Sequence, residues 1–390
     1  MIKAAYMSLI LLLFTGALQI PALAQDQTNN TFGKGIRIAA KDSSFTMKFG
    51  ARIQTLYDGR LNLETNDYND RLLTRRARLK FDGYAYSPKL VYKIELAVSS
   101  TDISGGDSPE FGNTSRVILD AVLKWNFAPN WELWVGQTKL PGNRERVISS
   151  QNLQFVDRSN LNSRFNIDRD AGVQLHYDKN KFKFISSISM GDGRNIVTNN
   201  AGGYDYTLRA EYLPFGSFKS SGDYFNSDLS REPEPKLSIG VTYDYNDRAT
   251  HARGQLGDLL PAQRDLETLF IDAHFKYNGF SSLLEYANKK SPDGPVILDG
   301  GGNFVASFYT GEAISWQAGY LFLNNFEIAG RYTQVTPEAI TLNRDNTQMT
   351  FGVSKYFVGH NLKIQSDVTL IQEKSRDDVL MTRVQVELAF

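Results

Sequence analysis

Apolar and polar side chains alternate in short runs along most of the chain from residue 45 onward. In the first run, one face carries Phe45, Met47, Phe49, Ala51, Ile53 and Tyr57, and the other carries Lys48, Gly50, Arg52, Gln54 and Asp58. A repeat of two residues is typical of a β-strand whose two faces meet different environments. The pattern therefore predicts an all-β protein in which each strand has one apolar and one polar face.

Sixteen such runs can be followed, and short and long connections alternate between them. They cover residues 45–58, 73–82, 90–98, 117–127, 131–135, 171–177, 182–190, 204–212, 237–245, 266–277, 280–290, 311–322, 326–336, 346–357, 361–373 and 379–390. An even number of strands with short turns at one end and long loops at the other is typical of a bacterial outer-membrane barrel. We therefore expect a transmembrane antiparallel β-barrel of about sixteen strands, a size that leaves an aqueous lumen.

The first 43 residues divide into two segments that do not belong to the predicted barrel. Met1–Lys3 is positively charged, Leu9–Leu18 is apolar, and Ala22–Ala24 fits an Ala-x-Ala cleavage site, so residues 1–24 are predicted to be a secretory signal peptide. The alternative is one membrane-anchoring helix, but the apolar core is shorter than the roughly 20 residues that a span needs. Residues 25–43 are polar and are predicted to be a flexible periplasmic segment, with the barrel over residues 44–390.

The last run ends at an aromatic residue, Phe390. Its apolar face consists of Leu380, Thr382, Val384, Val386, Leu388 and Phe390. A terminal phenylalanine on an alternating strand resembles the signal that the outer-membrane assembly machinery recognises. Pairing of this strand with the first would also remove both edges of the sheet.

Composition is consistent with an exported barrel. The chain has no cysteine, which excludes a disulfide framework and a lipid-modified cysteine, and its formal net charge is zero. The 19 tyrosines and 24 phenylalanines are enough for the aromatic girdles at the two membrane interfaces. Soluble β-rich proteins also favour tyrosine, so composition alone does not exclude them.

The sequence gives no catalytic candidate. His176, His251, His274 and His360 lie on different strands or loops without the spacing of metal ligands. His176 and His274 fall on predicted lumen faces, where we expect solvated imidazoles. Gly-x-Ser-x-Gly and phosphate-loop motifs are absent, and Asp377–Asp378 is a loop pair that we expect to be solvated. We therefore expect no enzyme activity, metal, cofactor or nucleic-acid partner.

Two connections are unusually long. About thirty residues separate the strand at 131–135 from the strand at 171–177, and this stretch carries Lys139, Arg144, Arg146, Arg158 and Arg164. A connection of this length is uncommon, and an ordered one is usually functional. The other, residues 214–235, stands where a short turn is expected, and its alternative interpretation is a domain boundary.

The side chains predicted to face the lumen are mostly cationic over the first four strands. Four carboxylates, Asp58, Asp82, Glu95 and Asp120, are set against eight cations: Lys48, Arg52, Arg76, Arg78, Lys80, Lys93, Arg116 and Lys124. Rings of Arg or Lys are how anion pores select. The alternative is that these are the solvated charges of a general porin, paired with acidic residues on later strands.

Several blocks between residues 70 and 180 carry a family resemblance. They are Arg75–Phe81, Ile118–Ala121, Gly136–Pro141, Ser149–Ser150, Phe155–Ser159 and Asp170–Leu175. Together they resemble the phosphate-selective porin O and P family. The resemblance implies a homotrimer in the outer-membrane lipid, with a long third loop that folds into the lumen, and a channel whose arginines and lysines line the path of small anions.

By match to these blocks, the resemblance implies path residues at Arg75, Arg76 and Lys139. Arg144 and Arg146 are added because of their position in the long loop. Strand parity points Arg75 outward, from where its side chain could snorkel to the interface.

The sequence therefore predicts a passive porin that favours small anions such as phosphate over other small solutes. The first alternative is a non-selective diffusion porin. The second, from another class, is an exported soluble β-sandwich that binds glycans through exposed Trp and Tyr.

Overall fold

The structure is a computed structural model that describes residues 31–103 and 116–390, and its elements belong to one compact unit, Phe32–Phe390. The predicted signal peptide and residues 25–30 lie outside the described residues. The strands are β1 Ile36–Ala39, β2 Thr46–Asn62, β3 Tyr68–Ala85, β4 Ser87–Ala97, β5 Ile118–Ala128, β6 Trp131–Lys139, β7 Arg169–Lys179, β8 Phe182–Ser189, β9 Asp205–Tyr212, β10 Lys236–His251, β11 Leu259–Tyr277, β12 Phe280–Lys290, β13 Val296–Leu298, β14 Phe304–Ser307, β15 Gly311–Leu321, β16 Phe326–Pro337, β17 Asn346–Tyr356, β18 Leu362–Glu373 and β19 Val379–Ala389.

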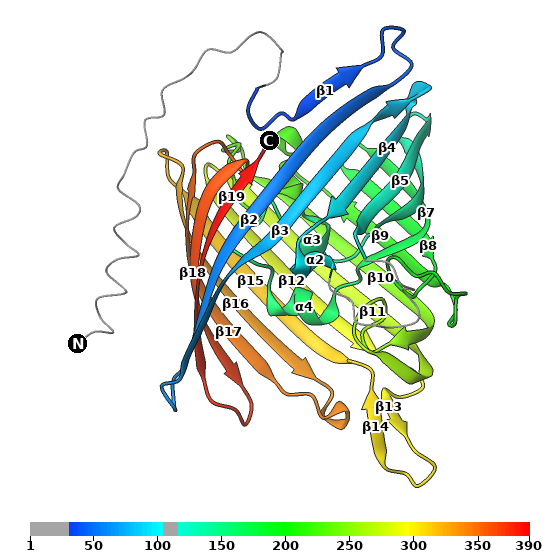
Figure 1. Cartoon of the computed structure of the whole chain (residues 1–390), viewed down its shortest axis with the longest axis vertical. Helices are drawn as coiled ribbons and strands as arrows, with labels where there is room; N and C mark the ends of the chain where they lie inside the picture. The colour runs from blue at the N-terminus through cyan, green and yellow to red at the C-terminus, as the bar shows by residue number, and fades with distance from the viewer. Residues whose placement is uncertain (1–30, 104–115) are drawn as a thin grey trace, which may run out of the picture. The chain divides into compact units, whose positions relative to one another are not determined.

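Within the described residues, sixteen strands form one closed antiparallel barrel (Figure 1). Each strand from β2 to β12 pairs with the next, β12 pairs with β15, and the ring continues to β19. It closes where β19 pairs with β2, from Val379 opposite Asn62 to Ala389 opposite Arg52. The predicted fold and strand number are confirmed.

The two faces of the strands meet opposite environments, and the apolar face points outward. On β9, Leu208 is 57% exposed while its neighbour Arg209 is 1% exposed; on β2, Ile53 is 46% exposed and Gln54 is fully buried. A soluble sandwich would bury its apolar face between two sheets. The observed arrangement is that of a barrel with an apolar outer surface, so the soluble-sandwich alternative is excluded.

The barrel has a turn end and a long-loop end. Short connections at the turn end place asparagines in the left-handed region, with φ of 66° at Asn130, 58° at Asn180, 46° at Asn278 and 62° at Asn325. Asparagine tolerates this conformation better than most residues, which explains why these strands reverse so tightly. The long-loop end carries the connections after β2, β4, β6, β8, β10, β12, β16 and β18.

One strand lies where the sequence pattern predicts none. Ile36–Ala39 forms β1, which pairs with Thr46–Phe49 of β2, within the segment predicted to be flexible. β19 reaches only as far as Arg52, so β1 continues the pairing along the edge of β2 that β19 leaves open. Pairing with β1 satisfies the backbone hydrogen-bonding groups on that edge of β2. With four residues, β1 is too short for the two-residue repeat of a strand to be recognised in the sequence.

The helices of the described chain are short. They are α2 Ser100–Ile103, α3 Arg144–Val147, α4 Asn160–Phe165 and the 3-10 helices η2 Lys219–Tyr224 and η3 Ala339–Thr341. None of the described helices has the length and apolar character needed to cross a membrane as a helix. α3 and α4 belong to the connection between β6 and β7, which we call the inner loop (residues 140–168), and they lie inside the ring of strands (Figure 1).

Candidate functional site

The inner loop is held against one side of the barrel wall by an apolar cluster. Its buried side chains Leu140, Leu161, Phe165 and Ile167 pack with Tyr309, which lies just before β15, and with the wall residues Phe270, Ala287, Ala313 and Val335. Burial of apolar area is favourable wherever it removes water, inside a barrel as in a soluble core. The loop therefore fills the part of the lumen next to β11, β12, β15 and β16.

Arg144 fixes the start of the inner loop. Its guanidinium is fully buried and pairs with Asp272 at 3.0 Å and with Glu211 at 3.2 Å. Burial alone would lower the pKa of Arg144, but these carboxylates outweigh it and raise the pKa well above its ordinary value. Arg144 therefore does not have the exposed position in the path that was expected of it, because it links the loop to the strands behind.

Lys139, the last residue of β6, also holds α3 in place. Its Nζ donates hydrogen bonds to the carbonyl oxygens of Arg146, Val147 and Ile148, at 2.9, 3.1 and 3.2 Å. A lysine ammonium has three N–H donors, and all three are used here. Although Lys139 borders the lumen as predicted, its donors stabilise the end of α3 and are not directed at a solute.

A second segment enters the lumen from the turn end. Residues 213–235, which we call the inner turn, meet the inner loop where the Asn226 backbone N–H donates to the Asn152 carbonyl at 3.0 Å. Lys276 donates to the carbonyls of Gly222 and Ser227, both at 2.8 Å. The long segment predicted at 214–235 thus exists, but it packs within the same compact unit, and the domain-boundary alternative is wrong.

Neither histidine predicted on a lumen face is a freely solvated imidazole, because His274 lies against the inner turn and His176 stacks on a side chain of the barrel wall. His274 is fully buried, with Nδ1 3.2 Å from the carbonyl oxygen of Asp223 in the inner turn. His176 stacks on Trp134 with ring centroids 3.9 Å apart. The sequence pattern placed both on the lumen face but could not show what else enters the lumen. Among the described residues, no group of three or more His, Cys, Asp or Glu could hold a metal ion.

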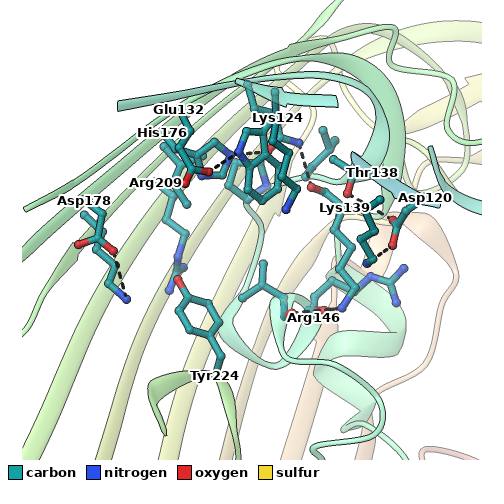
Figure 2. A pocket seen from close by; sticks show the side chains of 18 of the residues that line it. Asp120, Lys124, Glu132, Thr138, Lys139, Arg146, His176, Asp178, Arg209 and Tyr224 are labelled. Atoms are coloured by element: carbon teal, nitrogen blue, oxygen red, sulfur yellow. Dashed lines mark hydrogen bonds and ion pairs between the residues drawn. The ribbon is translucent and has the colours of Figure 1, made fainter. Parts of the chain in front are cut away.

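Two cavities are found in the lumen of the described chain, one towards the turn end, lined mainly by β4 to β9, and one towards the long-loop end, lined by β2, β3, β17, β18, β19 and the inner loop. The turn-end cavity has a volume of about 680 Å³ and is bordered by Asn130, Asp178 and Tyr224 (Figure 2). The long-loop cavity, of about 590 Å³, is bordered by Arg60, Arg194 and Glu373.

The residues that line both cavities are Arg78, Arg146, Arg158 and Arg169. Because they face each cavity, these four arginines stand at the boundary between the two. We call this boundary the arginine constriction. Arg146 and Arg158 belong to the inner loop and Arg78 to β3, and Arg169 is the first residue of β7.

Three of the four constriction arginines have carboxylate partners. Arg78 pairs with Asp102 at 2.7 Å and with Glu95 at 3.2 Å, and Arg169 pairs with Asp120 at 2.8 Å. Arg146 forms an ion pair with Asp168. These pairs reduce the net charge at the constriction without removing the cationic groups from its surface.

Arg158 differs from the other three. Its guanidinium donates to the carbonyl oxygens of Glu145 at 2.8 Å and Ile148 at 2.7 Å, and within the described residues it forms no ion pair with a carboxylate. Burial, and then the charge of Arg76, lower the pKa of Arg158 to about 9, so the group is still charged at neutral pH. Burial and then Arg158 and Arg169 likewise lower the pKa of Arg146 well below its ordinary value. An anion in the constriction would relieve this repulsion.

Arg75 lies inside the barrel and not outside it. The pairing of β2 with β3 shifts between Gln54 and Thr55, so that Arg75 is the extra residue of a β-bulge. The bulge turns Arg75 and Arg76 to the same side, where they pair with Asp157 of the inner loop at 3.1 and 2.7 Å. Strict alternation therefore gave the wrong side for Arg75.

The eleven predicted path residues separate into two groups. Six of them line one or both cavities: Arg75, Arg76, Arg78, Lys124, Lys139 and Arg146. The structure places the other five, Lys48, Arg52, Lys80, Arg116 and Arg144, outside both linings.

Arg144 is described above, and each of the other four has a different environment. Lys48 lies opposite Arg37 of β1, and Lys80 pairs with Asp82 at 2.9 Å. Arg52 donates to Ser150 Oγ at 2.9 Å and pairs with Glu387 at 3.6 Å. Arg116 donates to the Arg194 carbonyl at 3.4 Å.

Phe390, the predicted assembly signal, extends the closure of the barrel beyond β19. Its backbone N–H and C=O each form a hydrogen bond of 3.0 Å with Ala51, and its side chain is exposed.

Both cavity linings carry an excess of cations, and the excess is larger in the long-loop cavity. Within the described residues the long-loop cavity has four carboxylates, Asp102, Asp157, Asp168 and Glu373, and ten arginines: Arg60, Arg75, Arg76, Arg78, Arg146, Arg158, Arg164, Arg169, Arg194 and Arg383. The turn-end cavity has five carboxylates, Glu95, Asp120, Glu132, Asp178 and Glu211, and nine cations: Arg78, Lys93, Lys124, Lys139, Arg146, Arg158, Arg169, Lys183 and Arg209. Arg158 was noted only as a basic loop residue, and Arg169, Arg194 and Arg383 were missed, because only folding brings distant strands and loops together.

Solved structures of low sequence identity have the same fold. The anion-selective porin of Comamonas acidovorans is 12% identical, with a TM-score of 0.55 over 89% of this chain and 100% of that chain. A trimer form of OmpT, an outer-membrane protein of Vibrio cholerae, is also 12% identical, with a TM-score of 0.56 over 89% of this chain and 100% of that chain. At this identity, the likeness shows the fold alone.

The sequence relatives extend over most of the chain. An uncharacterized protein of Aquifex aeolicus is 23% identical over 393 residues, which cover 88% of this chain and 87% of that protein. Residues 47–255, more than half of the chain, match the family described as phosphate-selective porin O and P. The matched range contains the inner loop, the inner turn and all four constriction arginines. The chain is an outer-membrane β-barrel and belongs to the phosphate-selective porin O and P family.

Proposed function

We propose that this porin is a passive, water-filled channel for small hydrophilic solutes that favours anions, phosphate among them. The observation that carries the proposal is that the four described residues shared by the two cavity linings are all arginines. A permeating ion that crosses the boundary passes these four side chains, and rings of Arg or Lys lower the barrier for anions and raise it for cations. The selectivity named for the family is consistent with this.

Cations continue on both sides of the constriction. Arg194 and Arg60 border the long-loop cavity, while Lys93, Lys124 and Lys183 border the turn-end cavity. An anion would therefore meet a positive group at each stage and would not have to leave one deep well. Binding that is favourable but shared among several sites is what conduction requires.

One observation favours a second candidate, a non-selective diffusion porin. Arg78, Arg146 and Arg169 each pair with a carboxylate, so much of the charge at the constriction is compensated locally. If these pairs behaved as neutral units, small cations would pass as well as anions. The two candidates therefore differ in the effect of the uncompensated charge of Arg158.

The test is the reversal potential of single channels in a KCl gradient, with wild-type protein and Arg158→Gln. The glutamine keeps a polar side chain and removes the charge. We expect anion selectivity in the wild type and a fall of about two-fold or more in the ratio of chloride to potassium permeability in the variant, because screening is weak at contact distance. Arg248→Gln, at an exposed site of β10 outside both cavities, is the matched control.

A wild-type channel without anion preference would overturn the proposal in favour of the diffusion porin. Equal effects of the two substitutions would show that Arg158 is not in the path. Repeating the measurement with phosphate in place of chloride tests whether the preference extends to phosphate.

We further propose that the channel has no enzyme activity and that it assembles as a homotrimer. OmpT of Vibrio cholerae, which has the same fold, also occurs in a trimer form. Its apolar outer face would contact lipid, and Phe390 would be recognised by the outer-membrane assembly machinery. Unheated gel electrophoresis in detergent tests the trimer, since a trimer would migrate at three times the mass of the heated chain. Deletion of Phe390 tests the assembly role, with a lower yield of folded barrel expected.

A further inference from the structure

The two cavities differ in one respect that the anion preference does not explain. The lining of the long-loop cavity contains no aromatic side chain among the described residues, whereas the turn-end cavity is bordered by Trp131, Trp134, His176, Tyr177 and Tyr224. Inorganic anions gain nothing from aromatic rings. The turn-end cavity therefore has a feature suited to a solute with an apolar part.

Trp134 is held rigidly within this cavity. Its indole N–H donates to Glu132 Oε2 at 2.7 Å, and one face of the ring stacks on His176, with an angle of 21° between the rings. The imidazole is in turn 3.0 Å from Gln174, which donates to the Lys139 carbonyl at 2.9 Å. The orientation of the indole is thus fixed by partners on β6 and β7.

The other face of the indole is covered by Lys124. The strand order β5, β6, β7 places Lys124 directly opposite Trp134 on one side, while on the other side His176 lies opposite Glu132 and reaches Trp134 diagonally. The Lys124 Nζ lies 3.4 Å from the indole centroid, and in the described chain its ammonium has no hydrogen bond or ion pair. Figure 2 shows Lys124, Glu132 and His176 gathered at the wall of the cavity.

This arrangement leaves a replaceable group on a fixed aromatic surface. Lysine has a flexible four-carbon stem, and a cation on a ring in contact with water is held weakly. A planar ring of a solute could take its place on the indole, and the displaced ammonium could then pair with an anionic group on that ring. Such a solute would exchange one weak contact for a ring stack and an ion pair.

We propose that Trp134 and Lys124 form a binding subsite for organic anions that carry a planar ring, of which aromatic carboxylates are the simplest. The subsite rests on the proposed function, because the solute reaches it through the anion path. It adds a solute class that the arginine constriction alone does not distinguish from inorganic anions. The ring is bound by Trp134, and the carboxylate by Lys124.

The experiment compares benzoate with acetate as blockers of chloride current through single wild-type channels. Both carry one carboxylate, and they differ in the ring. We expect benzoate to halve the current at about a ten-fold lower concentration than acetate, the ratio that one aromatic stack provides. In Trp134→Leu this ratio should fall to near one, in Trp134→Phe it should persist, and Lys124→Met should weaken block by both anions.

Trp316→Leu is the matched control, because Trp316 is exposed on the outer face of β15 and does not line the cavity. Lys124→Met keeps the experiment decisive if Trp134→Leu does not fold, since unchanged block by both anions in that variant would also overturn the subsite. Equal block by benzoate and acetate in anion-selective wild-type channels, or an unchanged ratio in Trp134→Leu, would overturn the subsite alone. Reversal potentials measured in the same channels report separately on the proposed function, since an absence of anion selectivity would overturn that proposal first.

Discussion

Arg144 and Asp272 are 128 residues apart in the sequence, and the Nε of one lies 3.0 Å from the Oδ1 of the other inside the barrel. Asp272 also accepts from Arg209, which pairs with Glu211 at 2.7 Å. The result is a buried network of two guanidinium groups and two carboxylates between the inner loop and β9 to β11. We expect the position of the constriction to depend on this network, because Arg146 is two residues further along the loop.

Arg144→Met should therefore loosen the inner loop. The substitution leaves Glu211 and Asp272 with one cation in place of two, and breaking a buried pair typically costs about 3–5 kcal/mol. We expect a lower temperature of conversion from the folded to the unfolded gel band, and larger, noisier single-channel currents. Arg248→Met, at an exposed site, should change neither. If Arg144→Met conducted like the wild type with an unchanged transition, the network would not position the loop.

The sequence was sufficient for the barrel but not for the lumen. Alternation reports only which side of a strand is wet, so it placed Arg78 and Lys124 correctly. It could not show that Arg144 is buried rather than exposed to the path, because the carboxylate partners of Arg144 come from distant strands. It also failed at Arg75, because a β-bulge has no two-residue repeat. Arg169, in the constriction, lies at the junction of a loop and a strand, where periodicity ends.

The outward direction of alternate side chains can be tested on one strand. Leu123 on β5 is 53% exposed on the outer face, and Asn126 lines the turn-end cavity. Leu123→Arg should destabilise the barrel by about 2–4 kcal/mol if the site is near the bilayer midplane, whereas Asn126→Arg should be tolerated. Urea unfolding in lipid vesicles measures both. Equal losses of stability would mean that the outer face of β5 does not meet lipid.

The pair of arginines on Asp157 should make docking of the inner loop resistant to acid. Burial alone would raise the pKa of Asp157, but Arg76, Arg75 and Arg383 lower it well below its ordinary value. A carboxylate with a depressed folded pKa stabilises the fold fully above its unfolded pKa, near 3.8, and loses this contribution as pH falls through the folded pKa. Asp157→Asn should therefore lower the transition temperature by a constant amount from pH 8 to pH 5. The difference from the wild type should narrow only below about pH 4. A difference that vanished already at pH 6 would contradict this prediction.

The ion pair of Arg146 with Asp168 allows the charge at the constriction to be changed in either direction. A permeating ion there would pass well within the roughly 8 Å screening length of physiological salt, so each charge should affect permeation. At about 4 Å and an effective dielectric constant near 20, one charge contributes up to roughly 4 kcal/mol before hydration costs offset it. Asp168→Asn should therefore raise the ratio of chloride to potassium permeability, and Arg146→Gln should lower it. The double substitution restores the wild-type net charge and should return the reversal potential towards the wild-type value. Shifts of the same sign in both single variants would instead indicate that the substitutions act by moving the loop, and the net charge of the constriction would not set the selectivity.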